Sequence, residues 1–278
     1  MKRMKQHLLD GLQLTPVESG EKFSINDKAA RVPSAPKKDE LLDHTDALLE
    51  RLTELQDAFH ADGRRALLLV LQGRDASGKD GTIRSVCGAF NPTGVQITSF
   101  GVPTAFEAKH DFLWRVHQAV PAQGMIGVFN RSHYEDVLVV RARKLVPKSV
   151  WEKRYDHING FEATLADCGV VVRKCFLHVS RDEQHDRLAE RLADPEKNWK
   201  FRIGDLDDRA LWDEYSHAYR DMLSLCSRKD APWYIVPSDS KAVRNYLIAR
   251  MLVETLEGLD LQYPLMDEDV VQEAKGFK

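Results

Sequence analysis

A glycine-rich segment between an apolar run and a helical pattern constrains the fold of this chain more than any other feature. The segment spans residues 73–84, follows the apolar run 66–71 and has the spacing G-x-x-x-x-G-K. In a phosphate-binding loop, glycines let backbone N–H groups turn toward an anion, the lysine adds a point charge, and the following helix points its positive end at the phosphates. The alternative is an ordinary tight strand-to-helix turn. The spacing predicts phosphate contacts from Gly73, Arg74, Ala76, Ser77, Gly78, Lys79, Gly81 and Thr82.

Two carboxylates in this loop depart from the usual pattern. The position after Lys79 normally carries Ser or Thr for Mg²⁺, but here it is Asp80, and Asp75 lies inside the loop. Carboxylates repel phosphates unless a metal ion intervenes, and Mg²⁺ is commonly held by one or two carboxylates plus phosphate oxygens. We therefore expect Asp75 to bind Mg²⁺, or Mn²⁺ in its place. Asp80 is expected to start the helix, orient a group or handle a proton; the alternative is that both are solvated loop acids.

Further apolar runs alternate with helical patterns along the chain. Short apolar runs occur at 66–71, 95–100, 125–129, 170–179 and 233–236, and helix-period segments at 39–60, 105–119, 148–167, 181–193 and 207–227. Strands that alternate with helices indicate a parallel sheet with helices on both faces. The predicted fold class is therefore α/β, with three α/β/α layers.

A polar cluster follows the run 125–129. It reads Asn130-Arg131-Ser132-His133-Tyr134-Glu135-Asp136. Because ligands bind beyond the carboxyl ends of parallel strands, this cluster is expected to face the phosphate loop. The Arg131 guanidinium is suited to a phosphate, and Glu135 and Asp136 to a metal or an acceptor. His133 is interpreted either as a proton relay or, preferably, as a histidine hydrogen-bonded into the fold.

Charge is distributed unevenly along the chain. The formal net charge is −3, yet residues 131–154 carry a local +4 and residues 64–84 a local +3. This pattern predicts a cleft that collects a polyanion, although solvated helix faces give the same counts. Further cations surround residues 194–200, which interrupt the helical period and are interpreted as a lid or a surface hairpin. They are Arg187, Arg191, Lys197, Lys200 and Arg202.

These segments together resemble polyphosphate kinase family 2, which transfers phosphoryl groups between inorganic polyphosphate and nucleotides. The likeness rests on 73–82, 129–141, 194–200 and 232–237 and covers roughly 39–265. It implies a P-loop kinase fold with a helical lid at about 187–210, Mg²⁺ dependence and a homo-oligomer, either a dimer or a tetramer. It also implies that Asp75 binds the metal and that phosphates are bound by Lys79, Arg131, Arg191, Lys197, Lys200 and Arg202.

The resemblance also indicates which nucleotides are accepted. Members whose third strand ends in Phe-Asp have a second metal-binding acid where this chain has Asn130, so a second protein ligand is not assigned. The form of residues 130–136 is similar to the branch that phosphorylates nucleoside mono- and diphosphates, where the residue matching Glu135 lies near the acceptor. Asn130 and Arg131 are expected at the acceptor nucleotide as well. The expected reaction is reversible, in-line transfer from polyphosphate to AMP or ADP, with GMP and GDP as further acceptors. The alternatives are an ATP-dependent nucleoside or nucleotide kinase and a non-catalytic sensor.

The remaining segments set the expected boundaries. Residues 1–38 are interpreted as an arm that runs over the surface or is partly disordered, 39–265 as the catalytic domain, and 266–278 as an acidic tail. The six-residue apolar run 66–71 is far short of the roughly 20 residues of a membrane span, and no signal peptide is recognisable. Four cysteines without metal spacing favour a cytoplasmic protein. The acidic balance disfavours binding to nucleic acid.

Overall fold

The computed structural model describes residues 9, 11–21, 25–266 and 269–270. The predicted acidic tail therefore lies almost entirely outside the described residues, as do positions 1–8, 10 and 22–24 of the predicted arm. Five parallel strands form one sheet in the order β2-β3-β1-β4-β5, which confirms the predicted parallel sheet. The strands are β1 (Ala66–Gln72), β2 (Val95–Ser99), β3 (Ile126–Asn130), β4 (Val170–His178) and β5 (Trp233–Pro237).

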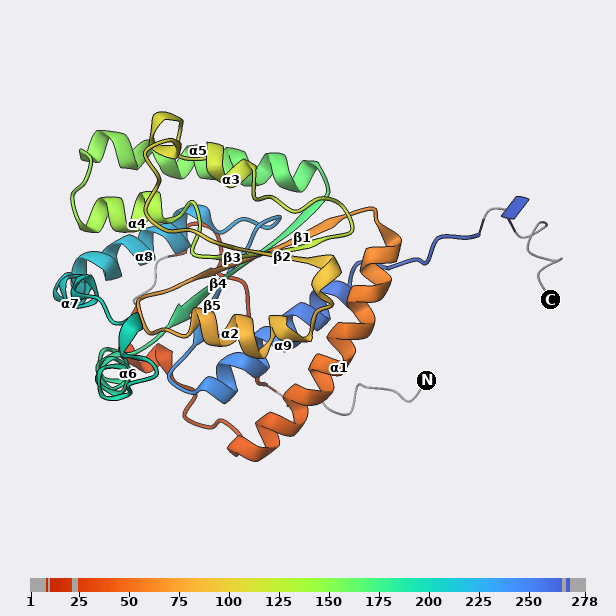
Figure 1. Ribbon diagram of the computed structural model, residues 1–278, viewed down its shortest axis with the longest axis horizontal. Coiled ribbons are helices and arrows are strands. Elements are labelled where there is room, and N and C mark those ends of the chain that lie inside the picture. The colour runs from red at the N-terminus through yellow and green to blue at the C-terminus, as the bar shows by residue number, and fades with distance from the viewer. Residues whose placement is uncertain (1–8, 10, 22–24, 267–268, 271–278) are drawn as a thin grey trace.

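Helices cover both faces of the sheet (Figure 1). One face carries α1 (Lys38–Asp62), α2 (Lys79–Ser85) and α9 (Lys241–Glu257), and the other carries α3 (Trp114–His117), α4 (Glu135–Ala142), α5 (Lys148–Asp167) and α8 (Trp212–Cys226). At the end of the molecule away from α1 lie α6 (Arg181–Ala193) and α7 (Ile203–Ala210). The short 3-10 helices are η2 (Asp27–Ala30), η3 (Cys87–Ala89), η4 (Pro92–Gly94), η5 (Glu107–Lys109) and η6 (Asn198–Lys200).

The central strand β1 explains why the apolar run is unbroken. Side chains of a strand alternate between the two faces of the sheet. Leu67 and Leu69 pack in the core with α1 and α9, whereas Leu68 and Val70 pack in the core with α4, α5 and α8. All four are buried. Helices on both faces thus require apolar residues at every position of the strand, as in other parallel sheets.

The predicted helix at 105–119 is wrong for most of its length. Only η5 and the single turn of α3 are helical there. Polar side chains bind the backbone locally instead: Glu107 accepts from Thr104 N, and Asp111 accepts from Leu113 N. Such local bonds compete with the helix ladder. The predicted helix at 207–227 is divided at Leu211, and α4 and α9 were not predicted.

The N-terminal arm lies along the exposed edge of the sheet. Pro16 forms an isolated antiparallel bridge with Tyr234 of β5, and Val17 N donates to the Trp233 carbonyl at 2.8 Å. The Ser227 hydroxyl donates to the Val17 carbonyl at 2.6 Å. Because β5 is an edge strand, its free backbone groups would otherwise be open to pairing with another chain. The described part of the arm thus runs over the surface and covers this edge.

Replacing Val17 by proline is expected to lower the melting temperature more than replacing it by alanine. Proline removes the N–H that donates to Trp233, while alanine shortens the same side chain and keeps that donor. The difference corresponds to about 1 kcal/mol, the net contribution of one hydrogen bond. Thermal denaturation of both variants followed by circular dichroism measures it. Equal melting temperatures would show that the bridge to β5 contributes nothing.

None of the helices in the described part of the chain combines the length and the apolar character needed to cross a membrane.

Candidate active site

The loop between β1 and α2 adopts a conformation that requires glycine at position 78. Gly78 has φ +104°, in the left-handed region, and immediately precedes the first residue of α2. A Cβ atom built on it would lie 1.9 Å from Arg244 Nη1. Space is also tight at Gly73, where a Cβ would lie 2.6 Å from the Leu177 carbonyl oxygen. Both positions bring the backbone close to neighbouring groups, as a phosphate-binding loop requires.

We expect Gly78→Ala to lower phosphotransfer activity by roughly 100-fold, the loss that displacement of reacting groups by about 1 Å can cause. The added methyl group displaces Arg244, and the positive φ is strained for alanine. Gly88→Ala is the matched control, because a Cβ at Gly88 meets nothing within 4 Å and its φ is not positive. Initial rates of the two folded variants test the prediction, which equal rates would refute.

Lys79 lies at the first position of α2 and points back into the loop. Its Nζ donates to the carbonyls of Gly73 at 2.7 Å and Arg74 at 3.1 Å. Burial, followed by the neighbouring Arg131 charge, lowers the pKa of the Lys79 ammonium to about 8. The group is therefore predominantly protonated at neutral pH. The loop therefore holds a buried cation against its own carbonyl groups.

The exit of β3 contacts the loop directly, as the sequence predicts. Arg131 Nη2 donates to Asp75 Oδ1 at 2.7 Å, and Asn130 Nδ2 donates to Asp80 Oδ1 at 2.8 Å. Glu135, at the start of α4, lies 3.8 Å from the Arg131 guanidinium. Burial raises the pKa of the Glu135 carboxyl, and the charges of Arg131 and Lys79 oppose that rise. Five predicted site residues from two separate segments thus face one another.

Arg74 is placed differently from the other loop residues. Its guanidinium lies 3.8 Å from the centre of the Trp212 ring and donates to Ser216 Oγ at 2.6 Å. This buried side chain ties the loop to the start of α8, so the predicted phosphate contact of Arg74 rests on its backbone N–H alone. The hydroxyls of Ser77 and Thr82 are buried without a hydrogen-bond partner among the described residues. Ala76 has φ +60°, and Gly81 packs beside Arg244.

Two side chains of α6 clamp the backbone of the loop. Gln184 Nε2 donates to the Asp75 carbonyl at 3.0 Å. Arg187 donates to the carbonyl of Ala76 at 2.9 Å and to that of Ser238 at 2.6 Å. Arg187 is one of the predicted lid cations, whereas Gln184 was not predicted to reach the site. No local pattern marks such contacts, because the partners lie 51 to 111 residues apart.

The other predicted lid cations lie on α6, at or just before η6, and immediately before α7. Arg191 pairs with Asp205 at 3.4 Å, Lys197 pairs with Asp194, and Lys200 lies 5.1 Å from the centre of the Trp199 ring. Arg202 is exposed and immediately precedes α7. None of the contacts described for these four residues reaches the phosphate loop. Their role at the phosphates remains a prediction.

A pocket opens where the loop, the exit of β3 and α8 meet. It is lined by Gly73, Asp75, Arg131, Glu135, Gln184 and Tyr219, among others. A wider hollow lies between α4, α5 and α8, but it contains none of the predicted site residues. His133 is buried with Nε2 3.2 Å from Glu162 Oε1, so it is bonded into the fold rather than directed at this pocket.

The carboxylates at the pocket suit Mg²⁺ only in part. Asp75 is partly exposed at its mouth and presents the hard oxygen atoms that Mg²⁺ prefers. Within the described residues, no group of three or more His, Cys, Asp or Glu side chains is arranged to hold a metal ion. The donor set therefore fits an ion whose remaining ligands are phosphate oxygens and water.

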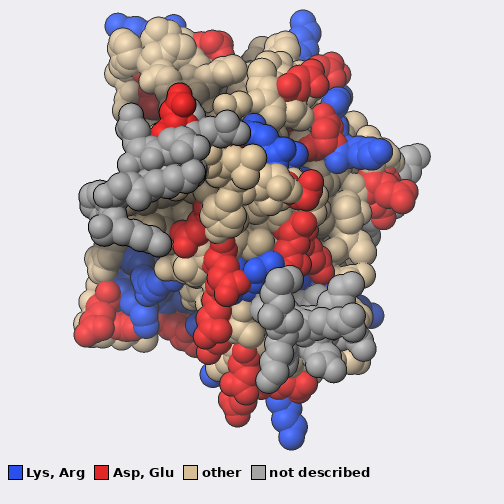
Figure 2. Space-filling view, turned by 90° about the vertical axis from the view of Figure 1, so that its right-hand side faces the viewer, with Lys and Arg blue, Asp and Glu red and all other residues tan. Residues whose placement is uncertain are grey.

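Figure 2 shows the face of the molecule that lies over α1, away from α6 and α7. Acidic side chains run down the middle of this face, with basic ones between and beside them. Such mixed charge offers little attraction to a polyanion. By contrast, the loop and the exit of β3 bring two cations, Lys79 and Arg131, close together.

The fold and this site together define a P-loop phosphotransferase, because the loop follows the central strand of a parallel sheet and carries a buried lysine. The sequence profile of the family described as Polyphosphate kinase 2 (PPK2) matches residues 35–264. The chain therefore belongs to the polyphosphate kinase 2 family, as the resemblance indicates.

Individual relatives agree with this assignment. An AMP/ADP-polyphosphate phosphotransferase of Meiothermus ruber is 56% identical over 217 residues, which cover 78% of this chain and 81% of that protein. An ADP-polyphosphate phosphotransferase of Rhodopseudomonas palustris is 42% identical over 261 residues, 89% of this chain and 90% of that protein. The crystal structure of polyphosphate kinase 2 from Arthrobacter aurescens TC1 superimposes with a TM-score of 0.87 at 39% identity and covers 95% of this chain and 98% of that one.

Proposed function

We propose that this chain transfers a phosphoryl group from inorganic polyphosphate to nucleoside mono- and diphosphates, with AMP and ADP as acceptors. The observation that carries the proposal is the contact of Arg131 with Asp75 beside the buried Lys79, which places two cations and a carboxylate at one phosphate-binding loop. The names of the relatives from Meiothermus ruber and Rhodopseudomonas palustris, which specify AMP or ADP with polyphosphate, support the choice of substrates.

The proposed chemistry is direct, in-line transfer. The bond between the terminal phosphorus and its bridging oxygen breaks, and the polyphosphate, one unit shorter, keeps the electron pair. A phosphate oxygen of the acceptor forms the new bond to the same phosphorus. Lys79 and Arg131 offset the negative charge that shifts between these oxygens, and the loop backbone orients the donor.

We propose Asp75 as the protein ligand of Mg²⁺, which would supply charge neutralisation between the two phosphate chains. Glu135 is proposed to lie near the acceptor, and Asp80, held by Asn130, to orient the start of α2. A homo-oligomer and a cytoplasmic location remain predictions. The resemblance implies the first, and the cysteine pattern favours the second.

One assay tests the acceptors and the donor together. The purified chain is incubated with Mg²⁺, long-chain polyphosphate and one of AMP, ADP, GMP or GDP, without ATP, and the nucleotides are separated by chromatography. We expect ADP to give ATP, and AMP to give ADP and then ATP. Phosphorylation by ATP but not by polyphosphate would instead indicate an ATP-dependent kinase, and binding without turnover would indicate a sensor.

A further inference from the structure

The backbone of Arg131 is held in a conformation that its side chain disfavours. Arg131 has φ +63°, in the left-handed region that non-glycine residues seldom adopt. Its N–H donates to the Leu71 carbonyl at 3.0 Å, and its guanidinium reaches Asp75. A strained residue at a functional site persists only when its surroundings hold it in place. The neighbouring residues must therefore fix this turn.

The three residues that follow Arg131 are fully buried. Ser132, His133 and Tyr134 are each at most 1% exposed. The Ser132 hydroxyl accepts hydrogen bonds from Gln72 Nε2 at 3.1 Å and from Tyr134 N at 3.2 Å. This buried segment joins two residues of the pocket, because Arg131 precedes it and Glu135 follows it. Any group that anchors the segment sets the positions of both.

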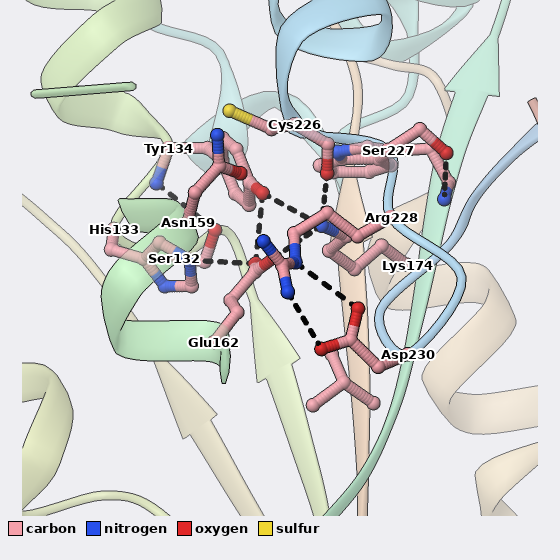
Figure 3. A network of polar contacts seen from close by, with 12 residues as sticks. Ser132, His133, Tyr134, Asn159, Glu162, Lys174, Cys226, Ser227, Arg228 and Asp230 are labelled. Atoms are coloured by element: carbon pink, nitrogen blue, oxygen red, sulfur yellow. Dashed lines mark hydrogen bonds and ion pairs between the residues drawn. The ribbon is translucent and has the colours of Figure 1, made fainter. Parts of the chain in front are cut away.

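A buried ion pair anchors His133 and Tyr134 (Figure 3). The Glu162 carboxylate, from α5, accepts from the Tyr134 hydroxyl at 2.8 Å, and His133 Nε2 lies 3.2 Å from the same oxygen. Lys174, from β4, donates to Glu162, to the Tyr134 hydroxyl at 2.8 Å and to the Cys226 carbonyl at 2.6 Å. Every donor of the Lys174 ammonium therefore has an acceptor.

This pair is shielded from solvent and from the pocket. The side chain of Glu162 is 1% exposed and that of Lys174 is 0% exposed. Burial alone would raise the pKa of Glu162, but the charge of Lys174 and the bond from His133 outweigh it and lower the pKa. Glu162 is therefore ionised and accepts both bonds. A buried ion pair is weak evidence for stability, because apolar residues of similar size often replace one without loss.

We propose that the Glu162–Lys174 pair positions Arg131 and Glu135 for phosphoryl transfer by anchoring the buried segment between them. Glu162 and Lys174 are buried and do not line the pocket, so both are positioning residues. The inference rests on the role proposed for Arg131 at the phosphates. It predicts that removing the pair without leaving a lone buried charge impairs catalysis more than folding.

The test is the double variant Glu162→Gln, Lys174→Met, in which both buried charges disappear together. We expect kcat to fall about 10- to 100-fold, the range expected for a small misplacement of reacting groups. We expect KM for the nucleotide to change less than about threefold, because Lys79 and Arg131 keep their positive charges and still attract it. A crystal structure of the variant should show Arg131 Nη2 beyond hydrogen-bond distance of Asp75, against 2.7 Å here.

Two further variants separate positioning from a general loss of stability. Leu252→Ala removes a buried side chain of α9, on the opposite face of the sheet. Its kcat is compared with that of the double variant under conditions in which the same fraction of each protein is folded. Tyr134→Phe removes only the hydroxyl that Glu162 and Lys174 share, and should give a smaller loss of kcat in the same direction even if the double variant fails to fold.

An unchanged Arg131–Asp75 contact with wild-type kcat overturns the inference, as does a loss of kcat no larger than that of Leu252→Ala. The crystallographic distance does not depend on which acceptor is used. Failure of the proposed acceptors with wild-type protein is thus distinguishable from failure of this inference.

Discussion

Lys79→Ala is expected to lower kcat for transfer from polyphosphate by about 100- to 1,000-fold, the effect of removing one group that stabilises charge in the transition state. The Lys79 ammonium is buried in the loop and has no acidic partner within it, since it donates only to the carbonyls of Gly73 and Arg74. A phosphate entering the loop therefore meets a cation whose charge is not already neutralised by an ion pair. The nearby guanidinium groups are already bound elsewhere, because Arg131 contacts Asp75 and Arg187 donates to loop carbonyls.

The measurement is the initial rate at saturating polyphosphate and ADP, with folding checked by thermal denaturation. Lys148→Ala is the matched control: the Lys148 side chain is 75% exposed and lies on α5, in the hollow that contains no predicted site residue. It should retain wild-type activity. If Lys79→Ala stays within threefold of the control, Lys79 is not the phosphate-binding cation.

Asp75→Asn is expected to reduce activity by at least about 100-fold and to raise the Mg²⁺ concentration needed for half-maximal rate. The substitution keeps the size of the side chain and removes the negative charge that makes a carboxylate the usual protein ligand of Mg²⁺. It also weakens the bond from Arg131 Nη2, because a charge-assisted bond becomes a neutral one on the acceptor side. Both effects act on the transferred phosphate.

Titration of the rate with Mg²⁺ measures this effect and separates it from misfolding. Asp46→Asn, the same chemical change at an exposed position of α1, should leave the titration unchanged. A near-wild-type rate and an unaltered Mg²⁺ requirement for Asp75→Asn would remove Asp75 from the metal site. The metal ligand would then have to be sought among Asp80 and Glu135.

Much of the site was predictable because its parts are short and contiguous. The spacing of Gly73, Gly78 and Lys79, read with the apolar run before it, predicts the loop and its place after a strand. Asn130, Arg131 and Glu135 follow the third apolar run, at 125–129. Parallel strands end at the same edge of the sheet, so their approach to the loop follows from the topology. The contacts of Arg131 with Asp75 and of Asn130 with Asp80 agree with that expectation.

Other features could not be predicted because they depend on distant partners. Arg74 looks like a phosphate ligand by its position in the loop, but Trp212, 138 residues later, supplies the carbonyl and the ring that bind its guanidinium. The segment 105–119 has the helical period, but local bonds from Glu107 and Asp111 replace most of the helix.

The amino-acid sequence by itself determined the phosphate loop and the parallel sheet, because strand period, glycine spacing and the helix start act over a few neighbouring residues. The tertiary structure alone decided where the charges act. Glu162 and Lys174 lie on different elements. They form an ion pair, and bind the Tyr134 hydroxyl, only because α5 packs against β4. A buried charge is tolerated only where partners converge on it, and that convergence is a property of the packed chain rather than of any segment.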